Sequence, residues 1–355
     1  MMVQAVRRFL ACLGATLALA SCHASDGAAR TGEPQLVLPA SFTGTLPCGR
    51  SHGMRAHLDL WPDGTFHLGR EASDEPGCED DVGRWRRDAG SAVILLYGGR
   101  EMPLQLEIVG PRILRALDID GRPAGQGSAH DLVSDGRLEP TDVQRPLHGM
   151  FRYMADAPTF AECLTGRSYP VAMEADYLAL ERAYLGLRTT EPGAAVLASF
   201  DGEIAQRPPM EGNGTVPTVV VKRYVGLWPG QSCERAMSHA SLSQQYWRVV
   251  SLRGAAAGPV DGSREPQLIL RGTEHGYSAD AGCGRFAGDY RVEGRAIRFQ
   301  APAIIPGCPV ALREQQAALL RVLEDARAWR IQGQVLELFD APGQPLAVLE
   351  AVYLR

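Results

Sequence analysis

The chain has 355 residues, of which 45% are hydrophobic, and 36 basic against 41 acidic side chains give it a formal net charge of -5. This length predicts two or three domains. The acidic balance provides no basic field to attract nucleic acid, and no block of like charge marks an interaction tail, so we exclude nucleic acid as a partner.

The first residues predict a lipoprotein signal peptide over residues 1–21. Arg7 and Arg8 precede a short apolar run from Phe9 to Leu19, and the run ends in Leu19-Ala20-Ser21-Cys22. This ending resembles the lipobox of bacterial lipoproteins, in which the cysteine becomes the first mature residue and is acylated. The alternative is an ordinary signal peptide with Cys22 at the cleavage point by chance.

An acylated Cys22 makes the lipid bilayer a partner of the chain. No later segment approaches the roughly 18 apolar residues of a transmembrane helix, so lipid is the predicted anchor. Residues 22–36 are small and polar without periodicity, which predicts a tether between the lipid and the first folded unit.

The cysteine count predicts disulfides. Of 8 cysteines, Cys12 leaves with the signal peptide and Cys22 takes the lipid. The remaining six are Cys48, Cys78, Cys163, Cys233, Cys283 and Cys308. An even number in an exported chain favours disulfides over thiol chemistry. Sequence alone leaves every pairing open, but if each unit folds by itself, nearest neighbours pair: Cys48 with Cys78, Cys163 with Cys233, and Cys283 with Cys308.

Residues 37–135 predict a small, lipocalin-like β-barrel. Two alternating segments, 57–61 and 65–68, flank Pro62-Asp63-Gly64, a hairpin turn in which glycine supplies a positive φ. Apolar side chains also alternate over 104–108. Two prolines then make residues 136–146 a predicted linker.

Residues 147–235 predict an OB-like barrel with one helix. The helix is predicted from apolar residues at helical spacing: Met173, Tyr177, Leu180 and Tyr184. Strands are expected at 195–200 and 203–207, on either side of a turn at Asp201-Gly202, and at 218–224.

Residues 243–355 predict a third β unit with one helix. A hairpin is expected from 288–292 and 296–299 across Glu293-Gly294, and strands are expected at 329–331, 334–339 and 346–353. The helix is predicted from an apolar face: Leu312, Leu319, Leu320 and Leu323. The fold class of the whole chain is therefore mostly β with minor α.

These units resemble known families. The first, through residues 39–48, 58–60 and 64–66, resembles the amino-terminal domain of the NlpE copper-resistance lipoproteins. The second resembles that family's carboxy-terminal OB-like domain, and the segments that carry the likeness are 149–157, 163–167, 169–172 and 180–184. The third is similar to META/HslJ domains through residues 247–249, 281–290, 308–309 and 336–338.

The resemblance implies an outer-membrane lipoprotein that faces the periplasm, and we expect the chain to be a monomer. NlpE-like proteins are linked to copper tolerance, to surface sensing and to activation of an envelope stress sensor kinase. In that family a carboxy-terminal disulfide reports oxidative folding, and Cys163 and Cys233 fall where it belongs. META/HslJ domains are linked to heat-shock or drug-tolerance phenotypes without known chemistry.

The first unit departs from its family at a possible copper site. The family carries Cys-x-x-Cys after Leu-Pro, whereas this chain has Cys48-Gly49-Arg50-Ser51. Cys48, His52 and Met54 still offer a thiolate, an imidazole and a thioether, which suit copper. The alternative is that Cys48 is locked in a disulfide with Cys78.

Other side chains that could carry chemistry have plainer explanations. Glu79-Asp80-Asp81 predicts a solvated loop, and three methionines are expected to fill the core: Met150, Met154 and Met173. The chain lacks the Gly-x-Ser-x-Gly, His-Glu-x-x-His, P-loop and Rossmann motifs, so we expect no enzyme. Two other functions stay open: a lipocalin-like carrier of a small apolar ligand, which a filled barrel would exclude, and a periplasmic scaffold.

Overall fold

A computed structural model describes residues 35–48, 51–71, 78–88, 91–100, 102–154, 157–187, 193–209, 212–236, 240–260, 263–272, 275–304 and 308–352. The predicted signal peptide and nearly all of the predicted tether, including Cys22, lie outside these described residues. Within them, no helix combines the length and the apolar character needed to cross a membrane.

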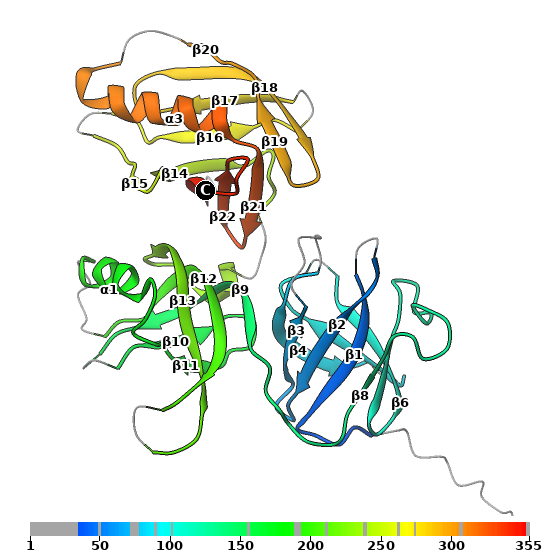
Figure 1. The fold of residues 1–355 in the computed structure, drawn as a ribbon. Coiled ribbons are helices and arrows are strands. Elements are labelled where there is room, and N and C mark those ends of the chain that lie inside the picture. Colours follow the sequence, from blue (N-terminus) through cyan, green and yellow to red (C-terminus); the bar gives the residue numbers. More distant parts are fainter. Residues whose placement is uncertain are drawn as a thin grey trace, which may run out of the picture. The chain divides into compact units, whose positions relative to one another are not determined.

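The first part of the described chain forms a closed antiparallel barrel of eight strands (Figure 1). The strands are β1 (Ala40–Cys48), β2 (Ser51–Leu60), β3 (Thr65–Arg70), β4 (Asp81–Arg87), β5 (Val93–Tyr97), β6 (Leu104–Gly110), β7 (Ile113–Ala116) and β8 (Asp131–Val133). Pairing of Gly44 with Leu132 joins β1 to β8 and closes the barrel. Glycine is needed there because a Cβ atom would collide with the carbonyl oxygen of Asp131. The hairpin at Pro62-Asp63-Gly64 is confirmed, with Gly64 at φ +79° between β2 and β3.

Side chains fill the interior of this barrel. The residues with at most 1% exposure include Phe42, Leu46, Leu58, Leu60, Phe66, Leu68, Ile94, Leu106, Leu114 and Leu132. They come from seven of the strands and form one apolar cluster. This packed core argues against the hypothesis of a carrier whose barrel holds a small ligand.

The second part is an antiparallel sheet with one helix of nine residues (Figure 1). Its elements are β9 (Val143–Arg152), β10 (Thr159–Glu162), β11 (Ser168–Pro170), α1 (Tyr177–Leu185), β12 (Val196–Arg207), β13 (Val216–Trp228) and the short α2 (Cys233–Ala236). The strand order is β11-β10-β9-β12-β13. A parallel bridge between Val171 and Val219 brings the chain after β11 to β13, so the sheet curls as an OB-like barrel does.

The expected turn at Asp201-Gly202 is wrong. β12 continues through both residues, and its pairing with β13 shows register shifts there. Gly202 serves packing instead, because a Cβ atom would lie 2.8 Å from the Phe200 ring and 2.9 Å from Leu147. Opposite this point stands Pro146 of β9, which cannot donate to the ladder.

β9 also begins inside the predicted linker, at Val143. Val143 and Leu147 are buried, at 0% and 1% exposure, on either side of Pro146. Pro146 argues against a strand in the sequence, but the apolar side chains on either side of it belong to the core, and β9 pairs with β12 in unbroken register through Pro146.

The predicted helix starts later than expected. α1 begins at Tyr177, and its buried residues are Tyr177, Leu180 and Tyr184, as the helical spacing predicts. Met173 lies before the helix and is 54% exposed, so its place on that helical face is wrong. The physical reason is Ala175, whose φ of 53° interrupts helical geometry directly before the helix.

The last part is a second large antiparallel sheet with a helix packed against it (Figure 1). Its strands are β14 (Tyr246–Leu252), β15 (Ala255–Ala256), β16 (Gln267–Leu270), β17 (Gly276–Asp280), β18 (Arg285–Glu293), β19 (Ala296–Phe299), β20 (Ala303–Ile304), β21 (Ala328–Gln332), β22 (Val335–Phe339) and β23 (Pro345–Val352). A 3-10 turn, η1 (Val310–Leu312), precedes α3 (Arg313–Asp325). Pairing of β14 with β23 closes the sheet, and α3 buries Leu319, Val322 and Leu323 in its core. The mostly β fold class is confirmed.

Polar contacts join the barrel to the middle sheet. All described residues belong to one compact unit, residues 34–355. Nε2 of His67 on β3 lies 3.2 Å from the Tyr169 hydroxyl on β11, and Arg167 donates to Asp63 at 2.8 Å.

His67 is 3% exposed, and burial lowers its pKa to about 4, whereas burial raises the pKa of Tyr169 to about 12. Both rings are therefore neutral near pH 7.

We predict that the buried His67 makes the fold less stable in acid. In the unfolded chain a histidine binds its proton near pH 6.5, but in the fold only near pH 4, so acid favours unfolding between these values. Between pH 8 and pH 4, the unfolding free energy of the unmodified chain should fall by about 3 kcal/mol more than that of the His67→Gln variant. Urea unfolding at each pH measures this difference.

His57 provides a contrast of opposite sign. A hydrogen bond to Asp59 raises the pKa of His57, so its protonation below pH 6.5 stabilises the fold. His57→Gln should therefore increase the loss in acid. If the two variants shift the pH profile in the same direction, the assignment to His67 is wrong.

Candidate functional site

Three disulfides lie among the described residues. They join Cys48 to Cys78, Cys163 to Cys233 and Cys283 to Cys308, with Cα–Cα distances of 5.5, 5.1 and 5.0 Å. These are the pairs that the nearest-neighbour hypothesis names. The bridge from Cys163 to Cys233 spans 70 residues, against 30 and 25 for the other two.

The Cys48–Cys78 disulfide occupies the place of the predicted copper ligands. Both cysteines are buried, and Nη1 of Arg70 lies 3.6 Å from the Cys48 sulfur. Met54 is half-buried and pairs with Leu46 across β1 and β2, while the side chain of His52 lies outside the described residues. Among the side chains that the structure describes, no group of three or more His, Cys, Asp or Glu could hold a metal.

The acidic stretch at residues 79–81 is not a solvated loop throughout. Glu79 is exposed, but Asp81 starts β4 and is 3% exposed. Its carboxylate forms ion pairs with Arg145 and Arg100 and accepts the Gly99 amide hydrogen at 2.9 Å. Distant arginines compensate its burial, and spacing along the chain does not reveal them.

The methionines also differ from expectation. Met150 packs against a buried cluster, as predicted. Met154 and Met173 are 59% and 54% exposed, so the prediction that they fill the core is wrong. Both lie in connections outside the strands, where the periodicity used to place them does not hold.

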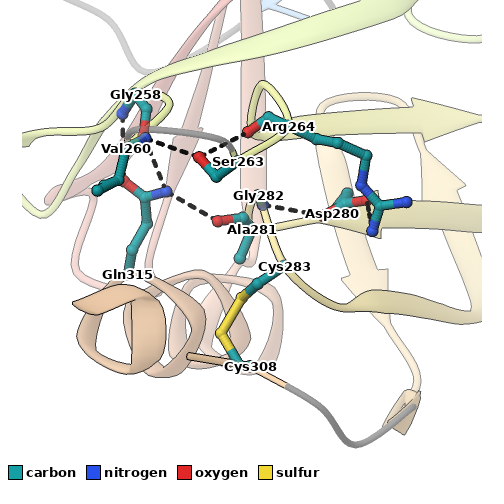
Figure 2. The surroundings of a disulfide bond; sticks show 10 residues. All are labelled: Gly258, Val260, Ser263, Arg264, Asp280, Ala281, Gly282, Cys283, Cys308 and Gln315. Atoms are coloured by element: carbon teal, nitrogen blue, oxygen red, sulfur yellow. Dashed lines mark hydrogen bonds and ion pairs between the residues drawn. A yellow bond between two sulfur atoms is a disulfide. The ribbon is translucent and has the colours of Figure 1, made fainter. Parts of the chain in front are cut away.

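The Cys283–Cys308 disulfide has a structural environment (Figure 2). It links the turn after β17 to the segment before η1. Beside it, Gln315 of α3 donates to the Ala281 and Gly258 carbonyl oxygens at 2.8 and 3.2 Å and accepts the Gly258 amide hydrogen at 3.1 Å. This bridge and these bonds hold the start of α3 against the sheet.

The Cys163–Cys233 disulfide follows a tightly bonded corner. Glu162, 1% exposed, accepts hydrogen bonds from the amides of Leu164 and Thr165 at 3.0 and 2.7 Å and from the Thr165 hydroxyl at 2.7 Å. Burial raises the pKa of Glu162. The Cys163 amide donates to the His148 carbonyl oxygen at 2.9 Å, which ties the disulfide to β9.

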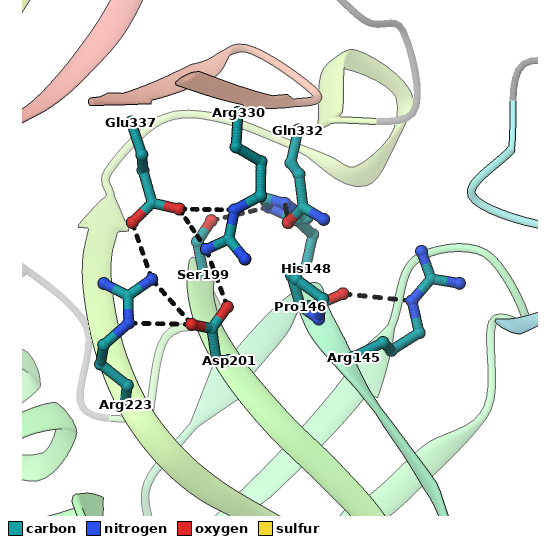
Figure 3. A network of polar contacts seen from close by, with 9 residues as sticks. All are labelled: Arg145, Pro146, His148, Ser199, Asp201, Arg223, Arg330, Gln332 and Glu337. Carbon is teal, nitrogen blue, oxygen red and sulfur yellow. Dashed lines mark hydrogen bonds and ion pairs between the residues drawn. The ribbon is translucent and has the colours of Figure 1, made fainter. Parts of the chain in front are cut away.

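A chain of side-chain hydrogen bonds continues from His148 (Figure 3). Nδ1 of His148 lies 2.7 Å from the Ser199 hydroxyl, which accepts the Trp228 indole hydrogen at 2.7 Å. Nε2 of His148 lies 3.1 Å from Oε1 of Gln332 on β21. Because an amide oxygen only accepts, Nε2 carries the hydrogen and Nδ1 accepts from Ser199.

Four charged residues form a network next to this chain (Figure 3). Asp201 and Arg223 come from β12 and β13, and Arg330 and Glu337 come from β21 and β22. Arg223 donates to Asp201 at 2.8 Å and to Glu337 at 2.7 Å, while Arg330 donates to Asp201 at 2.9 Å and also to Glu337. Each cation therefore contacts both anions, and the charges balance.

A cavity of about 410 Å³ adjoins Cys163. Its lining includes four arginines: Arg100, Arg145, Arg295 and Arg330. Each has a carboxylate partner, at Asp81, Asp81, Glu79, and Asp201 with Glu337, respectively. With their charges already compensated, we assign no anionic ligand to this cavity.

Comparison with protein families gives three matches. The NlpE N-terminal domain matches residues 42–126, the NlpE C-terminal OB domain matches residues 142–234, and the META domain matches residues 240–353. The chain is also 32% identical over 206 residues to lipoprotein NlpE of Escherichia coli strain K12, a match that covers 55% of this chain and 81% of that protein.

Two solved structures are also similar. The crystal structure of the Cpx pathway activator NlpE from Escherichia coli is 26% identical, with a TM-score of 0.26, and the match covers 56% of this chain and 99% of that one. A lipoprotein structure from Shewanella oneidensis is 24% identical, with a TM-score of 0.24, covering 29% and 93%. By its 32% identity over 81% of the Escherichia coli protein, this chain belongs to the NlpE lipoprotein family, and it carries a META domain after the two NlpE domains.

Proposed function

We propose that this chain is an outer-membrane lipoprotein on the periplasmic side, anchored through acylated Cys22, that signals envelope stress without catalysing a reaction. The observation that carries the proposal is the 32% identity over 81% of Escherichia coli NlpE, a protein described as a Cpx pathway activator. The partner would be an envelope stress sensor kinase.

The polar side chains support a role without catalysis. Ser199 and His148 are at hydrogen-bond distance, as a nucleophile and its base would be. However, Ser199 is 2% exposed and also accepts the Trp228 hydrogen, so a substrate carbonyl has no access to it. The pair serves packing.

Signalling can be tested in Escherichia coli cells that lack their own NlpE and carry a reporter of the Cpx pathway. We expect expression of this chain to raise the reporter signal, because both NlpE domains are present. Cys22→Ala is the matched control, since it removes the acylated residue and leaves every described residue unchanged. No reporter response at normal expression and membrane localisation would contradict the proposal.

We further propose that the Cys163–Cys233 disulfide reports oxidative folding. It closes a loop that contains β11, α1, β12 and β13, and in the chain-entropy model such a bridge contributes about 4 kcal/mol. When oxidation fails, the middle sheet loosens and presents a different surface to the sensor kinase.

A double variant tests this role. Cys163→Ser/Cys233→Ser should lower the unfolding free energy of the middle sheet by about 4 kcal/mol and change the reporter signal. Cys283→Ser/Cys308→Ser is the control, because it removes a disulfide distant from the NlpE domains in sequence. Unchanged stability and unchanged signalling in the first variant would rule the role out.

A copper function requires prior reduction of the first disulfide. Thiolates bind Cu(I), and Cys48 is bonded to Cys78. We therefore expect competition with a Cu(I) chelator to show binding by the reduced mature protein and not by the oxidised protein, and Cys48→Ser to abolish it. Equal binding in both redox states would show that Cys48 is not a ligand.

A further inference from the structure

The Cys163–Cys233 disulfide belongs to an apolar cluster that two sheets build together. The buried members are Cys163, Leu197, Trp228, Val335 and Val348, and half-buried Met150, Val225, Cys233 and Val250 pack against them. Three members belong to the META domain: Val335 on β22, Val348 on β23 and Val250 on β14. The other members belong to the NlpE C-terminal OB domain. Cys163 is 8% exposed within this cluster.

The charged network crosses the same boundary. Arg223 donates to Glu337 at 2.7 Å and Arg330 donates to Asp201 at 2.9 Å, and both bonds join the middle sheet to the META sheet. Glu337 has 5% side-chain exposure, so its charge depends on these arginines. The third polar link is the contact of His148 with Gln332, which begins at the residue that accepts the Cys163 amide hydrogen.

The disulfide also determines where the chain enters the META domain. Cys233 begins α2, and only a few residues later Ala240 donates its amide hydrogen to the Gly333 carbonyl oxygen at 2.8 Å. Gly333 lies between β21 and β22, the strands that carry Arg330 and Glu337. The Cys163–Cys233 disulfide therefore fixes one end of a short connection whose other end, at Ala240, contacts the turn between β21 and β22.

From these contacts we propose that the META domain is a built-in ligand of the OB domain, and that its docking is coupled to oxidation of Cys163–Cys233. The OB surface around Trp228 and the disulfide is the interaction surface, and the face carrying Arg330, Val335 and Glu337 occupies it. Reduction frees Cys233 and loosens docking, whereas docking shields Cys163 and stabilises the oxidised form.

Coupling of this kind is reciprocal by thermodynamic linkage. If oxidation favours docking by a given factor, docking must favour oxidation by the same factor. The proposal extends the redox role given above. It can be tested on purified protein without any kinase, so its failure is distinguishable from a failure of signalling.

The test measures reduction of each disulfide in glutathione buffers. Two glutathione thiols reduce one disulfide to two cysteine thiols and become one glutathione disulfide. The mature chain without its lipid is equilibrated over a range of glutathione ratios, free thiols are alkylated, and each cysteine is quantified by mass spectrometry. Cys48–Cys78 and Cys283–Cys308 serve as internal references in the same sample.

The decisive variant exchanges two charges on the META side, Arg330→Glu/Glu337→Arg. It keeps an ion pair within the META sheet but places like charges opposite Asp201 and Arg223. We expect Cys163–Cys233 to become easier to reduce by about tenfold in the midpoint glutathione ratio, as is typical of coupled sites, with both reference disulfides unchanged.

Two further variants complete the design. Adding Asp201→Arg/Arg223→Asp restores opposite charges across the boundary and should return the midpoint towards that of the unmodified chain. Arg115→Glu/Asp131→Arg, a bidentate pair within the barrel whose arginine is 27% exposed against 23% for Arg330, should have no effect. An unmoved midpoint in the first variant, an equal shift of all three disulfides, or no recovery in the fourfold variant would each overturn the proposal.

Discussion

The Cys163–Cys233 bond is the constraint on which the middle of the molecule depends. It joins the end of β10 to the start of α2, so the helix and two long strands of the OB domain lie between its ends. The same bond positions the connection to the META domain through Ala240 and Gly333. One covalent link therefore limits the unfolded states of one domain and the entry of the chain into the next.

The sequence predicts the fold where local chemistry decides it. Gly64 was expected to turn a hairpin, and it has a positive φ; Tyr177, Leu180 and Tyr184 were expected on one helical face, and they are buried. The family resemblance is likewise confirmed by the matches to both NlpE domains and to the META domain. These features depend on residues a few positions apart, so a linear pattern contains them.

The errors arise where distant residues decide. The pair Asp201-Gly202 is typical of a turn, but Gly202 is needed because the space beside Phe200 and Leu147 leaves no room for a side chain. The acidic stretch around Asp81 is typical of a solvated loop, but Arg145, far along the chain, compensates the charge of the buried Asp81 carboxylate. For the same reason the sequence does not predict the network of Asp201, Arg223, Arg330 and Glu337. Each of these residues looks like a solvent-exposed charge on a strand, and only the packing of the two sheets brings them together.

The balance of forces at the boundary supports the proposed control by the disulfide. Desolvation of Glu337 offsets much of its attraction to Arg223 and Arg330, so the network selects one orientation more than it adds stability. The apolar part offers Val335 and Val348 from the META side, and burial of such side chains contributes about 1.5–3 kcal/mol each at most. The disulfide holds Cys233 beside the end of β10, so docking costs less backbone freedom, at about 1–2 kcal/mol per residue, than it would with Cys233 free. Loss of this constraint would therefore remove a contribution comparable to the burial of a docked valine, which is the physical basis of the coupling proposed above.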